Sequence, residues 1–273
     1  MKDHTMSHTR VAIAGLGAIG KAVALALHNG LPGLKLTAIA ARDVDKASTW
    51  LAEHNIDAAV VTLGELPSHA DLVVECAPGT ILSDICTPML KAGRRVMVLS
   101  AAALLTRPEL IELARVHSGQ IIVPSGALLG LDAVTAAAEG TIQSVTMITR
   151  KPPGGLAGAP HLERNSISVA GLTTPKLVFK GNAREAALGF PANVNVAAAL
   201  SLAGIGPDRT TIEIWADPGV TRNCHSIVVV SDAATFTVSI ENVPSENPKT
   251  GRITAQSVLA ALRKINAPLR IGT

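Results

Sequence analysis

Three glycines near the amino end have the spacing of a dinucleotide-binding loop. Gly15, Gly17 and Gly20 form Gly-x-Gly-x-x-Gly, which follows the apolar run Val11–Ala14 and precedes an Ala/Leu-rich stretch. In a strand–turn–helix unit, the first glycine permits the turn, the second lets backbone approach a diphosphate, and the third allows close helix packing. Free N–H groups and the helix dipole then favour the phosphates. The pattern predicts a dinucleotide site, and ordinary turn glycines are the alternative.

The residue that ends the second strand commonly decides which nicotinamide dinucleotide binds. An acidic residue about 20 positions after the glycines holds the ribose 2′-hydroxyl and favours NAD. Here Ala41 takes that position and Arg42 follows it. An arginine pairs with a 2′-phosphate, so we expect NADP to be accepted as well as NAD. The alternative is that Arg42 is a solvated surface residue.

A nicotinamide-dependent enzyme needs a group that moves a proton, and histidine suits neutral pH. Of the eight histidines, His161 lies in a Gly/Pro-rich loop and is ambiguous. His225 precedes an expected strand, Ser226–Ser231, from which it could face a cleft between domains; a satisfied polar residue is the alternative. Three others lie at expected helix ends, where a cation offsets the helix dipole: His28, His54 and His117.

Two lysines and an asparagine are further candidates. Lys151 and Lys249 could each clamp a substrate carboxylate, and Lys151 could also act as an amine catalyst; both are solvated lysines in the alternative view. Asn195, at an expected helix start, is either a helix cap or a ligand group. Cys224 is discounted as a nucleophile paired with His225, because neighbouring residues on a strand point to opposite faces.

Composition limits the classes of protein that need considering. The chain has 273 residues, 48% of them hydrophobic and 16% charged, with a net charge of +3. There is no basic run for nucleic acid, no membrane-length apolar run, and no tyrosine to act as an acid. The three cysteines lack metal-site or disulfide spacing, so we expect reduced thiols, no metal and a cytoplasmic location.

The order of expected elements predicts the fold class. Strands and helices alternate up to about residue 130, which is typical of an α/β, Rossmann-type, doubly wound parallel sheet. We expect this dinucleotide-binding domain over residues 10–130, with a C-terminal helix at 252–267 packed on it. Residues 131–251 should form a second α+β domain with a mostly antiparallel sheet. A face of that sheet could pair with a second copy, which suggests a homodimer.

The chain resembles the L-aspartate dehydrogenase family over about residues 11–265. The resemblance rests on the order and spacing of several motifs: Gly15–Gly20, Val74–Ala77, Pro124–Ala127, Arg150–Pro152, Gly181–Ala187, Phe190–Ala198, Ala216–Pro218 and Asn247–Thr250. It implies conversion of L-aspartate, NAD(P)⁺ and water into oxaloacetate, ammonia and NAD(P)H through iminoaspartate, which some members supply to NAD biosynthesis. The family's active-site histidine falls on His225, and two of its cofactor contacts fall on Ala127 and Asn195. The segment Pro152–Asn165 matches no motif.

We therefore expect aspartate to bind between the domains, with His225 as general acid/base and Lys151 and Lys249 near the carboxylates. Other open readings are a relative of homoserine dehydrogenase or dihydrodipicolinate reductase, or a protein that binds NAD(P) without catalysis. Ala77 follows a strand at the edge where α/β sheets bind ligands. The complete set of expected cofactor contacts is Gly15, Gly17, Ala18, Ile19, Gly20, Arg42, Ala77, Ala127 and Asn195.

Overall fold

A computed structural model of the chain describes residues 8–191, 194–244 and 251–272. Its contacts divide the chain into two compact units. The first unit runs to Ser100 and also contains Arg107–Pro124 and Val258–Arg270. The second unit consists of Ala101–Thr106, Ser125–Ser257 and the residues that follow Arg270.

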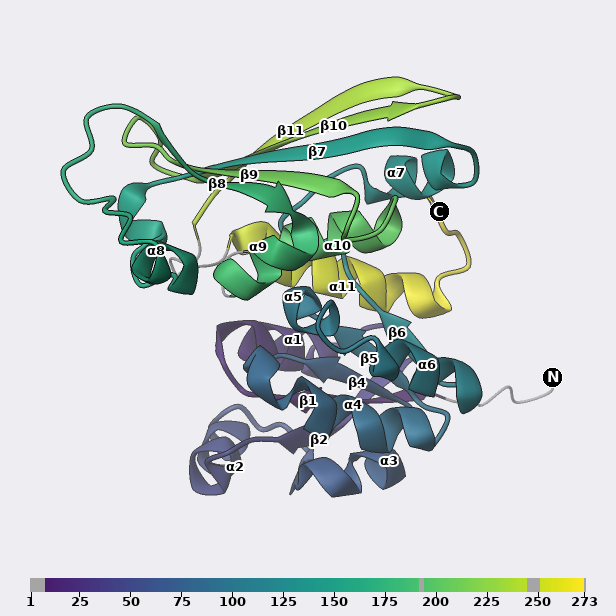
Figure 1. Ribbon diagram of the computed structural model, residues 1–273. Helices are drawn as coiled ribbons and strands as arrows, with labels where there is room; N and C mark the ends of the chain where they lie inside the picture. Colours follow the sequence, from purple (N-terminus) through teal and green to yellow (C-terminus); the bar gives the residue numbers. More distant parts are fainter. Residues whose placement is uncertain (1–7, 192–193, 245–250, 273) are drawn as a thin grey trace. The chain divides into compact units, whose positions relative to one another are not determined.

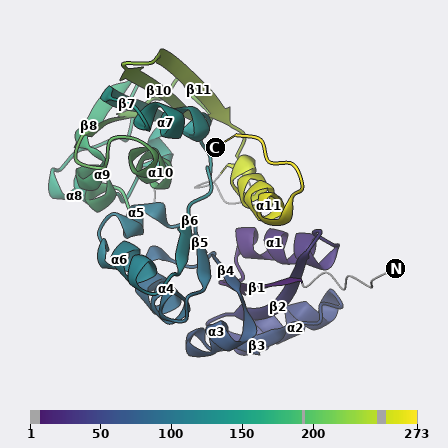
Figure 2. The same ribbon diagram turned by 90° about the vertical axis from the view of Figure 1, so that its right-hand side faces the viewer.

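The first unit is built on a six-stranded parallel sheet with the strand order β3-β2-β1-β4-β5-β6. This is the doubly wound order of a Rossmann fold, as the sequence predicts. Helices α1 and α2 lie on one face of the sheet, and α4 and α6 lie on the other (Figure 2). The strands are β1 (Thr9–Ala14), β2 (Leu34–Ala40), β3 (Ala59–Val61), β4 (Leu72–Glu75), β5 (Arg95–Val98) and β6 (Gln120–Ile122).

Helices lie between the strands of the first unit along the chain. They are α1 (Ala18–His28), α2 (Val44–Glu53), α3 (Leu66–His69), α4 (Leu82–Lys91) and α6 (Glu109–Val116). Asp43 caps α2 by accepting a hydrogen bond from the Lys46 amide. Helix α11 (Arg252–Asn266) contributes Val258 and Leu262 to the apolar core of this unit, together with residues of β1, β2, β4, α1 and α2.

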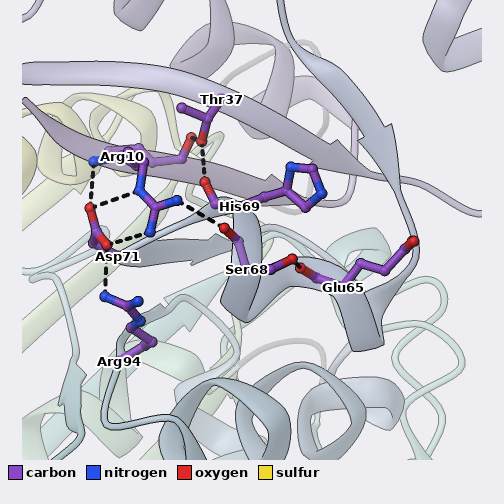
Figure 3. A network of polar contacts seen from close by, with 8 residues as sticks. Arg10, Thr37, Glu65, Ser68, His69, Asp71 and Arg94 are labelled. Atoms are coloured by element: carbon purple, nitrogen blue, oxygen red, sulfur yellow. Dashed lines mark hydrogen bonds and ion pairs between the residues drawn. The ribbon is translucent and has the colours of Figure 1, made fainter.

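A polar network ties together the amino ends of three parallel strands in the first unit (Figure 3). The Asp71 carboxylate accepts hydrogen bonds from the Arg10 guanidinium, at 2.8 and 3.3 Å, and from Arg94 at 2.8 Å. The Arg10 hydrogen bonds hold the pKa of Asp71 below its usual range. Ligands of such sheets bind at the carboxyl ends of the strands, so this network at the opposite edge stabilises the fold.

The second unit contains a five-stranded sheet with the order β11-β10-β7-β9-β8. Three of its four pairings are antiparallel, as predicted, but β7 and β9 run parallel. The sequence pattern could not show this, because alternation with period two is the same for both kinds of pairing. The strands are β7 (Ile142–Lys151), β8 (Lys176–Asn182), β9 (Thr210–Ala216), β10 (Asn223–Ser231) and β11 (Thr235–Asn242).

Helices of the second unit pack on one face of this sheet, here called the inner face (Figure 1). Alternate residues of β7 from Val145 to Lys151 are buried there, whereas the residues between them are partly exposed on the outer face. The helices are α7 (Leu131–Ala138), α8 (Pro160–Arg164), α9 (Ala183–Gly189) and α10 (Asn195–Ala203). A further short helix, α5 (Ala101–Leu104), contacts α9 and α10 rather than the sheet. The unmatched segment 152–165 therefore contains a 3-10 turn, Pro153–Gly155, and α8.

The start of β10 differs from the prediction. His225 was expected to precede a strand that begins at Ser226, but it lies inside β10, which begins at Asn223. Residues 223–225 have little intrinsic strand preference. They are extended because they pair on both sides, with β7 and with β11.

Candidate functional site

The glycine loop of the first unit has the geometry that a diphosphate requires. Gly15 has a φ of +102°, and a Cβ there would lie 2.6 Å from the carbonyl oxygen of Cys76. A Cβ on Gly20 would collide with the carbonyl oxygen of Gly15. By contrast, a Cβ on Gly17 would meet no atom within 4 Å. Gly15 and Gly20 are therefore required by packing, whereas Gly17 faces open space.

The start of α1 leaves backbone donors available for an anion. Gly17 is its N-cap residue, and it provides no side-chain cap. Ala18 is exposed and Ile19 is partly exposed, and the first turn carries no acidic residue. The amide groups and the positive end of the helix dipole thus face outward without a competing carboxylate. This arrangement fits the phosphates of a dinucleotide.

The loop that follows β4 is held by a buried carboxylate that sequence analysis overlooked. Glu75, at the end of β4, is fully buried. It accepts hydrogen bonds from the amides of Ala77 (3.0 Å) and Leu99 (3.0 Å). Ser100 donates both its amide (2.8 Å) and its hydroxyl (3.0 Å). Burial raises the pKa of Glu75, and these hydrogen bonds oppose the rise. The carboxylate therefore joins the loop at Ala77 to the loop after β5.

Arg42 lies at the bend between β2 and α2, on the same edge of the first unit as Ala77. Its side chain is exposed, and the neighbouring Asp43 is occupied as the cap of α2. The residue before it, Ala41, is partly exposed and carries no charge. The end of β2 therefore presents a cation rather than the carboxylate that holds a ribose 2′-hydroxyl.

In the second unit, three polar side chains share the inner face of the sheet. Two of them, His225 and Lys151, are predicted site residues, and the third, Thr149, is not. His225 of β10 stands directly opposite Thr149 of β7 in the antiparallel register. The His225 Nδ1 atom lies 3.2 Å from the Thr149 hydroxyl oxygen. Lys151 follows two residues after Thr149 and therefore points to the same face. All three side chains are at least 95% buried.

Burial controls the charge of this group. It lowers the pKa of Lys151 to about 8. The pKa of His225 falls to about 3, chiefly because of burial and further because of the nearby Lys151 charge. At neutral pH the imidazole is therefore neutral and the lysine is cationic. A neutral imidazole can accept a proton, and a buried ammonium attracts a carboxylate.

Two other expected cofactor residues are held by hydrogen bonds within the second unit. The Ala127 carbonyl accepts a hydrogen bond from the buried Asn242 side chain at 3.1 Å. The Asn195 side-chain oxygen accepts one from the Ala102 amide at 3.1 Å. Asn195 is the first residue of α10, whose N-cap residue is Val194 and has no side-chain cap. The helix-cap alternative is therefore wrong for α10, and the Asn195 side chain instead binds the start of α5. Its amide nitrogen has no hydrogen-bond acceptor among the described residues.

The remaining candidates divide clearly. Lys249 lies outside the described residues. His161 packs its ring against Phe179 and Phe190, with ring centroids 5.2 and 5.3 Å apart, and so belongs to an aromatic cluster. Cys224 points to the outer face, opposite to His225, as expected. Among the described residues, no group of three His, Cys, Asp or Glu is arranged to hold a metal.

No helix in the described part of the chain combines the length and apolar character needed to cross a membrane.

Three residues of the candidate site were not predicted from the sequence: Thr149, Glu75 and Asn242. One signal was available for Glu75, which is the single charged residue within the apolar run of β4. Thr149 and Asn242 carried none, because threonine and asparagine at strand positions are common.

Comparisons with known proteins agree with this geometry. The family model described as aspartate dehydrogenase, C-terminal, matches residues 132–265, and that of the homoserine dehydrogenase NAD-binding domain matches residues 15–124. L-aspartate dehydrogenase 3 of Bordetella bronchiseptica is 60% identical over 96% of this chain and 97% of its own length. L-aspartate dehydrogenase of Bradyrhizobium diazoefficiens is 55% identical over 100% and 98%.

Solved structures show a shared fold. The crystal structure of aspartate dehydrogenase from Thermotoga maritima has a TM-score of 0.74 at 24% identity, covering 97% of this chain and all of that one. Apo scyllo-inositol dehydrogenase from Lactobacillus casei has a TM-score of 0.58 at 13% identity, covering 95% and 87%.

The glycine loop generates a test that separates binding from folding. Gly17→Ala should change the free energy of unfolding by no more than about 0.5 kcal/mol, because its Cβ meets open space. It should raise the dissociation constant for NAD(P)H at least about tenfold, because the methyl group blocks the approach of the diphosphate. Gly20→Ala should lose about 1–3 kcal/mol of stability through overpacking. Thermal unfolding and fluorescence titration measure both effects.

Gly64→Ala is the matched control, because Gly64 is exposed and its added Cβ also meets nothing. It should leave both quantities unchanged. Undiminished binding by Gly17→Ala would show that the diphosphate does not lie against this loop.

Burial of His225 predicts a loss of stability in acid. Between pH 6.5 and 3 the unfolded chain binds a proton on His225 that the folded chain does not, so stability falls as the pH is lowered through this range. At pH 5 the cost is about 2 kcal/mol. Urea unfolding at pH 7.5 and pH 5 measures how much the free energy of unfolding decreases in acid. This decrease should be smaller in His225→Gln than in the unmodified protein, by about that amount.

His28→Gln serves as control, since His28 is exposed at the end of α1. It should lose as much stability in acid as the unmodified chain. An equal loss in His225→Gln would mean that the imidazole is protonated in the folded state.

Proposed function

Because the chain belongs to the L-aspartate dehydrogenase family, we propose that it is an NAD(P)-dependent L-aspartate dehydrogenase. The reaction is L-aspartate + NAD(P)⁺ + H₂O → oxaloacetate + NH₄⁺ + NAD(P)H + H⁺, with iminoaspartate between the two halves. The structural observation that carries the proposal is that His225 and Lys151 are both buried on the inner face of the second sheet, where the His225 ring contacts Thr149. Iminoaspartate formed this way could also feed NAD biosynthesis.

The residues that would hold the cofactor fit it. Gly17 leaves room for the diphosphate at the start of α1, and Ala77 lies in a loop held by Glu75. In the second unit, Ala127 and the amide nitrogen of Asn195 are the further contacts that we propose. When bound, the nicotinamide ring accepts the hydride that leaves the aspartate Cα.

His225 and Lys151 supply the remaining chemistry. The Lys151 ammonium pairs with a carboxylate of aspartate, because the two carboxylates need compensating charge in a water-poor site. Lys249 is the second carboxylate partner that we propose. The neutral His225 takes a proton from the water that attacks the imine carbon, and the resulting carbinolamine then loses ammonia. A neutral imidazole is the required starting state for this step.

The function is tested by offering a panel of amino acids with NAD⁺ and with NADP⁺ and following absorbance at 340 nm. L-aspartate should give the highest kcat/KM. His225→Gln should lower kcat by about 10²–10⁴-fold, the usual contribution of a general base, while the dissociation constant for NAD(P)H stays unchanged. Glutamine keeps a polar side chain at this position, and thermal unfolding shows whether the His225→Gln variant is folded.

Other outcomes point to other proteins. Turnover of homoserine in place of aspartate would indicate a homoserine dehydrogenase-like enzyme. Reduction of dihydrodipicolinate with NAD(P)H would indicate a relative of that reductase. Cofactor binding without turnover of any substrate would indicate a non-catalytic NAD(P)-binding protein. Unchanged kcat in His225→Gln would remove His225 from the mechanism.

We propose that the enzyme accepts NADP⁺ through Arg42. Arg42→Ala should raise the KM for NADP⁺ about 10–100-fold, the value of lost charge-assisted hydrogen bonds to a phosphate. The KM for NAD⁺ should change less than about threefold, because NAD⁺ has no 2′-phosphate. Lys91→Ala removes an exposed cation at the end of α4 and is the control. Equal changes with both cofactors would contradict this role.

We further propose a cytoplasmic homodimer that pairs the outer faces of two β7–β11 sheets. Ile148, Val228 and Trp215 lie on this outer face and are only partly exposed. Its charges are largely compensated, since Arg150 binds Asp217 at 3.0 Å and Lys180 binds Glu213 at 2.9 Å. An apolar, charge-compensated sheet face suits association with an identical face.

The three cysteines are free thiols, which fits the reducing compartment that we propose.

A further inference from the structure

The Thr149 hydroxyl is the hydrogen-bond partner of the His225 ring on the inner face of the second sheet. Its oxygen lies 3.2 Å from Nδ1, and both side chains are buried. Antiparallel pairing places the two residues directly opposite each other on adjacent strands. Because β7 and β10 are central strands with partners on both sides, this contact is held by the sheet rather than by a loop.

The contact decides which ring nitrogen can do chemistry. The two nitrogens of a neutral imidazole differ, because one carries hydrogen and the other accepts a hydrogen bond. With Nδ1 bonded to Thr149, Nε2 is the nitrogen left for water or substrate. Nε2 can accept a proton only if the ring hydrogen is on Nδ1, and in that tautomer Nδ1–H donates to the Thr149 oxygen.

The same hydrogen bond persists when the ring becomes charged. In the imidazolium form both nitrogens carry hydrogen, so Nδ1–H still donates to the hydroxyl oxygen. The ring therefore need not rotate between its neutral and charged states. A hydroxyl also carries no charge, unlike the carboxylate partners that stabilise an imidazolium ion in many enzymes.

We propose that Thr149 is a positioning residue that holds His225 in its Nδ1–H tautomer and directs Nε2 to the reacting water. This inference rests on the proposed function for the identity of the reaction, but the tautomer itself is a property of the protein alone. In this role Thr149 acts through the histidine ring, which its hydroxyl contacts. The competing explanation is that Thr149 is a β-branched core residue of a central strand, valued only for its shape.

Two substitutions separate these explanations. Thr149→Val keeps the β-branched shape but removes the hydroxyl, whereas Thr149→Ser keeps the hydroxyl but loses the methyl group. If Thr149 positions the ring, Val should lower kcat on the order of 10–100-fold, as loss of an outer partner does for metal-binding histidines. The serine variant should stay within about threefold of the unmodified enzyme. The dissociation constant for NAD(P)H should be the same in all three.

The tautomer is measured without any substrate. In ¹⁵N-histidine-labelled protein at pH 7.5, imidazole nitrogen shifts identify the hydrogen-bearing nitrogen, and the His225 signals are those missing from His225→Gln. The unmodified protein and Thr149→Ser should carry hydrogen on Nδ1. Thr149→Val should move it wholly or partly to Nε2.

The results decide between the two roles. An Nε2–H tautomer in the unmodified protein, or the same tautomer and the same kcat in Thr149→Val, would overturn the proposal. An equal fall in kcat in Thr149→Ser and Thr149→Val would also overturn the proposal, because it would show that the shape of Thr149 matters and its hydroxyl does not. If the enzyme does not oxidise aspartate at all, the proposed function fails, while the nitrogen shifts still show whether Thr149 sets the tautomer.

Discussion

The register between β7 and β10 is the constraint on which the candidate site of the second unit depends. It pairs His225 with Thr149 and Cys224 with Arg150. Because side chains alternate along a strand, a shift of one residue would move the imidazole to the outer face and bring the thiol inside. The apolar residues further along the same strands, such as Val145 opposite Val229, prevent that shift because they would have to be exposed. The fold's hydrophobic core therefore also sets the geometry of its chemistry.

The first unit holds the loops around its glycine motif by a different means. The loops at the carboxyl ends of β4 and β5 are not joined by strand-to-strand hydrogen bonds. A single buried carboxylate joins them instead. Glu75 receives three backbone amides and one hydroxyl, so its burial is compensated and the two loops hold a common arrangement. Gly15 packs directly against the same segment, at the carbonyl of Cys76. The glycine loop and the loop at Ala77 are thus parts of one structure.

Local patterns predicted what depends on local physics. The packing roles of Gly15 and Gly20 and the order of strands and helices follow from residues within a few positions of one another. The pairing of Thr149 with His225 does not, because it joins residues 76 positions apart. Likewise, three of the four hydrogen bonds to Glu75 come from residues 24 and 25 positions further along the chain. The parallel pairing of β7 with β9 leaves no mark in the sequence pattern, because side chains alternate in the same way in parallel and antiparallel strands. Such features require the tertiary structure, since the same residue types would suit many other partners.

The charges of the inner face explain why a hydroxyl suits His225 better than a carboxylate. Lys151 is the cation there, and the described residues that act on the pKa of His225 add no negative charge. A carboxylate beside the imidazole would pair with Lys151, occupy the cation that a substrate carboxylate needs, and raise the pKa of the histidine. In the mechanism that we propose, Thr149 leaves His225 as a neutral base, and the substrate carboxylates supply the negative charge that stabilises the imidazolium ion. Binding of the substrate would then itself favour the proton transfer that follows.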